Sequence, residues 1–175
     1  MRTAPHIEPL KYERGWRPTK RAMDNHKIEH LFSYTASLRM PPEVIGPVAE
    51  GIRVNFYVTG GVISGPRCSG KLLPAGGDWL LIRKDGIGVV DVRVTMEMDG
   101  GALVYSAYTG LLDPGPNAYE AFLNGTLPPR FPIRTAPRFQ TAHPDYLWMN
   151  RVQAYSVGEV DLAGASVSYD VYAAL

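Results

Sequence analysis

Apolar and polar residues alternate without interruption between residues 90 and 98. One side of this segment carries Val90, Val92, Val94, Met96 and Met98, and the other carries Asp91, Arg93, Thr95 and Glu97. A period of two residues predicts a β-strand with two different faces. The pattern leaves two assignments open. Either the apolar row fills the interior and the polar row is solvated, or the apolar row packs under another layer and the polar row faces a cavity.

Shorter segments of the same kind follow one another along most of the chain. Turn residues separate them, as at Asp85–Gly86, which is a hairpin signal. We expect one short helix, from Asn117 to about Leu123, with Gly125 just beyond its end. Residues 39–51 are expected to form a connection. The expected strands are residues 29–38, 52–60, 60–73 (bent at glycines), 78–84, 88–98, 102–112, 130–142 (extended, with prolines), 146–160 and 165–175. About nine or ten strands joined by turns predict an all-β fold, a single closed and mainly antiparallel barrel.

The composition of the 175 residues is that of one ordinary globular domain, with 45% hydrophobic and 20% charged residues. A net charge of +1 gives no general attraction to nucleic acid or membranes, and neither partner is expected. Residues 1–27 differ, with seven Lys or Arg against three Asp or Glu. We expect them to form a basic N-terminal arm before a barrel domain of residues 28–175. The arm is a solvated tail or a contact with a partner subunit, which makes a homo-oligomer possible.

The single cysteine excludes an internal disulfide and fits a reducing compartment, so a cytoplasmic location is expected. No run of 18 apolar residues and no apolar signal-peptide core are present. Cys68 itself is interpreted as a small buried hydrophobic residue rather than a nucleophile.

Residues 64–73, SGPRCSGKLL, have the Gly-x-x-x-x-Gly-Lys spacing of a phosphate-binding loop. Such a loop needs Ser or Thr after the lysine to bind Mg²⁺, and it must lead into a helix. Here Lys71 is followed by Leu72, and the next residues include Pro74 and two glycines. We therefore expect the glycines to mark bends in a β-protein.

Motifs for metals and cofactors are also missing. The four histidines show no His-x-His or His-Glu-x-x-His spacing, and His26 and His30 share a face only on a helix, where a strand is expected. Neither a dinucleotide fingerprint nor a Gly-x-Ser-x-Gly elbow occurs. The sequence predicts no metal site and no cofactor.

The stretch VTGGVISGPRCSGKLLPAGGDW resembles the central signature of the DUF3237 family, also called UPF0311. Further matching pieces follow in order, namely DVRVTMEMDGGALVY, IRTAPRFQTA, YLWMNR and YDVY, so that the resemblance covers residues 28–175. It implies a small closed β-barrel and little about the reaction, because the family was named for unknown function. Tyr57, Ala107 and Thr109 depart from the family pattern, which implies a less charged and more aromatic pocket.

The resemblance also selects polar positions for a site. Acid–base chemistry indicates Asp91 or Glu97 as base and Tyr105 or Tyr57 as acid. The groups that would stabilise an anion are Arg53, Arg93 or Arg138. For Asp91 and Arg93 a structural ion pair between strand neighbours is an equal alternative. Asp78 is interpreted as a residue that orders the Gly76–Gly77 turn. Predicted substrate-binding residues are Tyr34, Asn55, Tyr57, Arg138, Trp148 and Asn150.

These residues lead to one main functional hypothesis and two rivals. We expect a cofactor-independent lyase-type enzyme that acts by elimination, retro-aldol-type cleavage, cyclisation or isomerisation. Its substrate is expected to be a small aromatic or otherwise apolar oxygenated molecule held in the barrel. The rivals are a non-catalytic barrel that binds a hydrophobic metabolite and an assembly protein that uses its arm.

Overall fold

The computed structural model describes residues 27–175, which form ten strands and two short helical segments. The predicted arm, residues 1–26, lies outside the described residues. The helical segments are α1 (Ala118–Leu123) and the 3-10 helix η1 (Pro144–Arg151). The strands are β1 (Ile28–Leu38), β2 (Glu43–Pro47), β3 (Ile52–Ser64), β4 (Gly70–Ile82), β5 (Gly88–Met98), β6 (Leu103–Leu112), β7 (Arg130–Thr135), β8 (Arg138–Gln140), β9 (Gln153–Asp161) and β10 (Ser166–Ala174).

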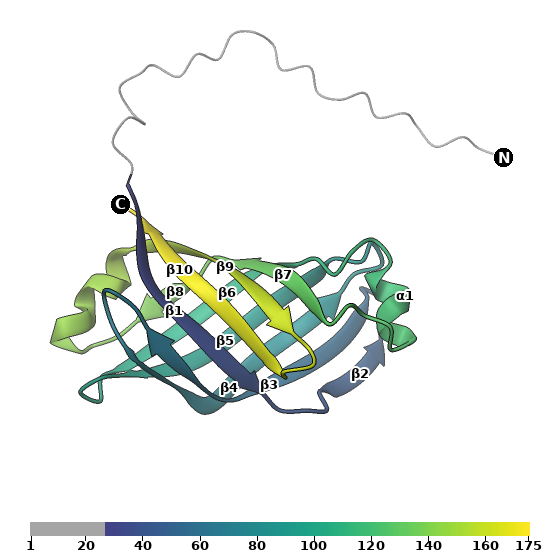
Figure 1. Ribbon diagram of the computed structural model, residues 1–175, viewed down its shortest axis with the longest axis horizontal. Coiled ribbons are helices and arrows are strands. Elements are labelled where there is room, and N and C mark those ends of the chain that lie inside the picture. The colour runs from purple at the N-terminus through teal and green to yellow at the C-terminus, as the bar shows by residue number, and fades with distance from the viewer. Residues whose placement is uncertain (1–26) are drawn as a thin grey trace, which may run out of the picture.

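Eight of the strands close into an antiparallel barrel. Their order is β1-β10-β9-β7-β6-β5-β4-β3, and β1 pairs with β3 to complete the ring (Figure 1). The two other strands extend the wall. β2 pairs with the first residues of β3, and β8 pairs with β6 next to the stretch that β7 occupies. The predicted closed antiparallel barrel is confirmed.

The burial pattern of β5 decides between the two assignments left open by its alternation. Its apolar residues, Val90 to Met98 at every second position, are buried, whereas the polar residues between them are partly or largely exposed. The apolar row therefore faces the interior of the barrel, and the polar row faces outward. The assignment with a solvated polar row is right.

Three local expectations are wrong. Residues 60–73 do not form one bent strand, because residues 65–69 turn the chain between β3 and β4. Residues 144–151 form η1 instead of a strand, and Pro144 at its start together with the His143 N-cap, which accepts from the Asp145 amide, favours that turn over a sheet. Residues 43–47, expected to be a connection, pair with β3 as β2.

The glycines of β3 and β4 allow a local distortion of the barrel wall. The pairing of β4 with β5 shifts between Leu72 and Gly76, so β4 carries two more residues than its partner there. Gly76 has a φ of +95°, and a Cβ atom at this position would lie 2.0 Å from the Arg93 carbonyl oxygen. Only glycine fits this bulge without strain.

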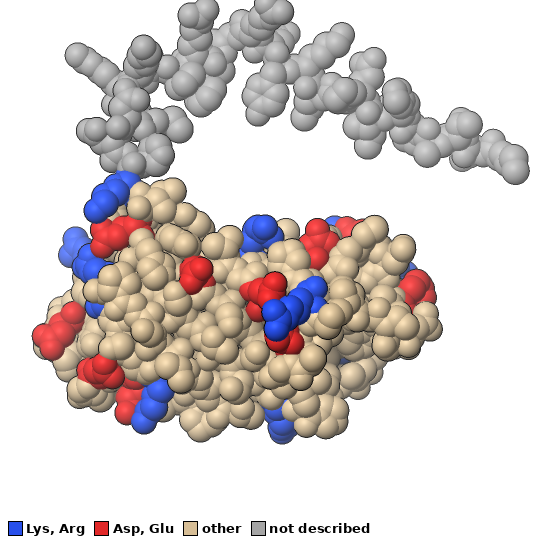
Figure 2. Space-filling view, viewed as in Figure 1, with Lys and Arg blue, Asp and Glu red and all other residues tan. Residues whose placement is uncertain are grey.

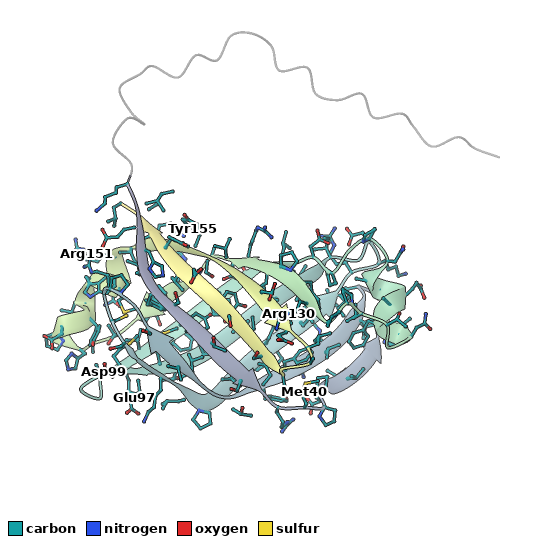
Figure 3. All side chains as sticks on the ribbon, viewed as in Figure 1. Met40, Glu97, Asp99, Arg130, Arg151 and Tyr155 are labelled. Atoms are coloured by element: carbon teal, nitrogen blue, oxygen red, sulfur yellow. The ribbon has the colours of Figure 1, made fainter. Side chains whose placement is uncertain are left out.

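The two ends of the barrel are filled differently. Toward η1 the interior is solid, and Phe32 packs edge-on against Phe139 with ring centroids 5.9 Å apart. Toward α1 and β2 the interior is hollow. Figure 3 places Met40 at this hollow end, and Glu97, Asp99 and Arg151 toward the opposite end. The barrel is thus a cup with a closed base and one open end. In residues 27–175, no helix is long and apolar enough to span a membrane.

Candidate functional site

The hollow end of the barrel holds a cavity of about 280 Å³. Its walls come from strands β1, β3, β4, β5, β6, β7, β9 and β10 and from α1. The lining is completed by Met40 and Pro42, which lie between β1 and β2, and by Phe122 and Leu127, which lie on and after α1. Met40 is 46% exposed and marks the mouth. A cavity of this kind, concave and mostly apolar, is the default place to look for a ligand.

The base of the cavity is one row of neighbouring residues across four strands. Phe56 on β3 pairs with Asp78 on β4, Asp78 pairs with Val92 on β5, and Val92 pairs with Tyr108 on β6. All four side chains line the cavity. Since adjacent strands are about 4.8 Å apart, the Cα atoms of Asp78 and Tyr108 are separated by about 10 Å or less on the curved wall.

Asp78 is the one carboxyl group among the residues that line the cavity. Burial raises the pKa of Asp78 to about 7, although the Asp91 amide donates to its Oδ1 at 2.9 Å and opposes the shift. The negative charge of Asp91 raises this pKa as well, and the charge of Arg53 lowers it. A carboxyl with this pKa is present in both protonation states near neutrality, as a general acid or base requires.

Asp78 sits at a gap in the hydrogen bonding between β4 and β5. The two strands pair at Asp78–Val92 and again at Leu81–Val89, but the residues between these points are not paired. In the gap the Asp91 amide donates to the Asp78 carboxyl, and the Trp79 carbonyl accepts from Arg53 Nη1 at 2.5 Å. These side chains thus form hydrogen bonds with the backbone N–H and C=O groups that are not paired between the two strands. This arrangement fixes the Asp78 carboxyl and links it to a cation on the outer face.

Two buried tyrosines, Tyr108 and Tyr169, line the cavity together with Asp78, and a third, Tyr34, packs behind them. Tyr34 donates a hydrogen bond to the Tyr108 hydroxyl at 3.0 Å. The Tyr169 ring lies 4.9 Å from the Tyr34 ring and 5.9 Å from the Tyr108 ring, between centroids. Burial raises the pKa of all three hydroxyl groups, so they stay protonated. Because the Tyr108 oxygen accepts from Tyr34, the Tyr108 hydrogen remains able to donate, to the neighbouring Tyr169 hydroxyl or to a ligand in the cavity.

The predicted catalytic residues on β5 and β6 lie outside the barrel. Asp91 forms an ion pair with Arg93 at 2.9 Å, and their side chains are 46% and 48% exposed. Glu97 pairs with Lys71 at 3.1 Å, and Tyr105 is exposed. Figure 2 shows the face of the molecule on which β1, β9 and β10 lie in front, and there too acidic and basic side chains are scattered over the outer surface. The alternative in which these residues face an interior cavity is wrong, because the apolar row of each strand takes the inside. For Asp91 and Arg93 the other alternative, a structural ion pair, is confirmed.

Arg53 also faces outward, yet it is not remote from the cavity. Its guanidinium group is partly buried on the Trp79 carbonyl, and its charge acts on Asp78 through the gap in the wall. In this position Arg53 can position and tune Asp78 but does not touch a ligand in the cavity.

The predicted substrate-binding residues are dispersed. Tyr34 does not line the cavity, but it is buried behind the lining and donates to the Tyr108 hydroxyl. Asn55 and Tyr57 lie under β2, where both donate to Glu43 Oε2, at 2.9 Å and 2.7 Å. The remaining three lie elsewhere: Arg138 is exposed on β8, Trp148 packs beneath Arg67 near η1, and Asn150 is exposed and bonds the Thr141 backbone.

Asp78, Tyr108 and Tyr169 were missed as site residues. Asp78 was interpreted as a turn residue because it follows two glycines, but Leu80 and Ile82 share its alternation and are buried. The inward direction of Asp78 could have been found by extending the alternation of β4 back from Ile82. Tyr108 alternates in the same way with Val104, whose side chain is also buried.

The donor groups of the described residues do not favour a metal or a phosphate-bearing cofactor in the cavity. Within residues 27–175, no group of three or more His, Cys, Asp or Glu side chains is placed to hold a metal ion. His30 contacts Ser33 and the Tyr172 ring on the outer face, and His26 lies outside the described residues. The cavity lining contains no Lys, Arg or His for phosphate groups.

Comparisons with known proteins agree on family and fold. Residues 26–174 match the family model described as "Protein of unknown function (DUF3237)". A UPF0311 protein of Rhodopseudomonas palustris is 30% identical over 151 residues, 85% of this chain and 97% of that protein. A protein of unknown function from Clostridium acetobutylicum superposes with a TM-score of 0.77 at 27% identity, over 86% of this chain and 100% of that one. An enzyme from Penicillium herquei superposes with a TM-score of 0.62 at 20% identity, over 92% and 99%, which shows a shared fold alone.

Proposed function

The chain belongs to the DUF3237 family of proteins of unknown function, and we propose that it is a cofactor-independent enzyme that transfers protons in its barrel cavity. The observation that carries this proposal is a carboxyl group with a pKa of about 7 in an apolar cavity that the Tyr108 hydroxyl also lines. The reaction class is that of a lyase or isomerase. The P. herquei enzyme supports the proposal only as an example of catalysis on this fold.

The proposed step begins at a carbon next to a carbonyl group. Ionised Asp78 takes a proton from that carbon, and the C–H electron pair forms a carbon–carbon double bond while the carbonyl oxygen gains negative charge. The Tyr108 hydroxyl donates a hydrogen bond to this oxygen. Return of the proton to another carbon gives an isomerisation.

Elimination follows when the β-carbon of the substrate carries an oxygen substituent. The C–O bond then breaks, its electron pair leaves with the oxygen, and the proton held by Asp78 passes to that oxygen. Water or an alcohol is released, and no oxidant or reductant is consumed. The apolar wall supports such chemistry because charge interactions are stronger where water is excluded.

The proposal is tested by the exchange of carbon-bound protons. Bicyclic ketones such as 2-tetralone are incubated in D₂O with the protein, and loss of the α-proton signals is followed by NMR. We expect exchange above the buffer rate, reduced about 10²–10⁴-fold by Asp78→Asn. Tyr108→Phe should reduce it about 10²–10³-fold, because one donor to the oxyanion is lost.

Glu97→Gln and Tyr105→Phe are the matched controls, since they make the same kinds of chemical change on the outer face, and neither residue affects the pKa of Asp78. Both should keep the exchange rate of the unmodified protein. If the outer-face variants lost exchange and the cavity variants kept it, the activity would lie on the outer face. That result would contradict the proposal.

A non-catalytic binding barrel is the second candidate, and the nearly continuous apolar lining of the cavity favours it. A protein of that kind binds the ketone and returns it with its α-protons unexchanged. The same NMR sample therefore distinguishes the two functions.

A further inference from the structure

The polar atoms of the cavity are few and gathered at one end. Asp78, Tyr108 and Tyr169 supply the polar side-chain groups of the lining, and all lie at its base. The walls above them are hydrocarbon, with aromatic rings from Phe56, Phe122 and other residues. A ligand of this cavity must therefore be apolar over most of its surface and polar at one end.

The volume of the cavity limits the size of that ligand. A cavity of about 150 Å³ lined by apolar side chains holds one benzene molecule. The volume here is about 280 Å³, nearly twice as large. The enclosed part of the ligand then corresponds to about two rings. A single ring would leave part of the wall without contacts.

The charges around the cavity decide the charge of the ligand. A carboxylate or phosphate ligand would lose its hydration on entering the cavity, and the lining has no cation to compensate for that cost. It would also face the carboxyl group of Asp78. An ammonium group would pair with ionised Asp78 and so occupy the base that the proposed reaction needs, and its remaining hydrogens would face hydrocarbon walls. Neither charged form fits, and a neutral acceptor oxygen does.

Resting on the function proposed above, we infer that the substrate of this site is an uncharged molecule of about two fused rings with a carbonyl oxygen at one end. The oxygen lies at the base of the cavity, where it accepts from Tyr108, and the adjacent carbon lies next to Asp78. The rings fill the space between this base and the mouth at Met40 and Phe122.

Calorimetry with four matched probes at pH 7 tests the inference. The probes are 2-tetralone, 2-naphthoate and 2-aminotetralin, which share the two-ring skeleton and differ in charge, and cyclohexanone, which has one ring. We expect 2-tetralone to bind at least about tenfold more tightly than each of the other three. Tighter binding of either charged probe, or of cyclohexanone, would overturn the inference.

Two substitutions on β5 show where the probe binds. Val92→Phe places a ring in the cavity and should abolish 2-tetralone binding, whereas Val89→Phe makes the same change on the outward side of the strand and should leave it unchanged. If Val92→Phe does not fold, Ala36→Leu narrows the same cavity from β1. Binding that survives in the folded cavity variants would place the site elsewhere and refute the inference.

The same samples separate this inference from the proposed function. Selective binding of 2-tetralone without exchange of its α-protons would keep the inferred ligand class and refute catalysis. Exchange with equal preference for charged probes would keep catalysis and refute the ligand class.

Discussion

Replacing Asp78 by asparagine should stabilise the protein in alkaline solution, because the wild-type carboxyl is ionised there in an apolar cavity. The pKa of Asp78 is about 7 in the folded chain against an ordinary value of 3.8. The folded state therefore holds the proton more tightly than the unfolded state. Between these two values the free energy of unfolding of the wild type falls as the pH rises.

The size of this effect follows from the difference in pKa. A difference of about three pKa units at 1.36 kcal/mol per unit gives about 4 kcal/mol as an upper limit. Asparagine keeps an oxygen that can accept from the Asp91 amide, so the hydrogen bond is retained. Asp78→Asn should therefore match the wild type near pH 4 and exceed its stability by about 2–4 kcal/mol at pH 8.

Urea unfolding followed by tryptophan fluorescence at pH 4 to 8 measures the difference between the two proteins at each pH. Other acidic groups contribute to both and cancel in the difference. Asp161→Asn serves as the control of opposite sign, because the Gly164 amide and the nearby Arg130 lower the pKa of Asp161. Asp161→Asn should lower the free energy of unfolding at pH 8 and leave it unchanged at low pH. A difference for Asp78→Asn that is flat with pH, or destabilising at pH 8, would refute the reasoning.

Three further predictions concern the surroundings of the cavity. Arg53→Met should raise the pKa of Asp78 further and shift the pH profile of proton exchange to higher pH, because a cation that favours the carboxylate is lost; an unchanged profile would exclude this coupling. Gly76→Ala should destabilise more than Gly100→Ala in urea unfolding, since both have a positive φ, worth about 1–3 kcal/mol of strain, but a methyl group at Gly100 meets open space. Burial raises the pKa of the Cys68 thiol to about 11, so its alkylation by iodoacetamide at pH 8 should be roughly a hundredfold slower than that of free cysteine, and rapid labelling would contradict its burial.

Most of the fold, but little of the site, could be predicted from the sequence. The alternation of residues 90–98 predicts a strand, and its repetition between turns predicts the barrel, because both depend on local periodicity. Which face points inward is a property of the closed sheet. For that reason Asp91 and Glu97, polar residues on the most regular strand, were the natural candidates and lie on the outer face.

The convergence of Asp78 and Tyr108 on one cavity cannot be found from local sequence pattern, for a physical reason. Asp78 follows Gly76 and Gly77, which are typical of a turn, whereas they form a bulge that lets β4 continue into the barrel. Tyr108 lies near Asp78 only because of the register in which three strands pair. This proximity depends on contacts between residues far apart in sequence, so it cannot be predicted from the spacing of residues within one segment.

The central claim is that the molecule acts through the base of its cavity, at Asp78 and Tyr108. A crystal structure of the protein with 2-tetralone tests this claim most directly. We predict electron density for the two rings inside the barrel, with the carbonyl oxygen within hydrogen-bond distance of the Tyr108 hydroxyl and the adjacent carbon facing the Asp78 carboxyl. Density for the ketone on the outer face beside Asp91 and Arg93, with an empty cavity, would contradict it.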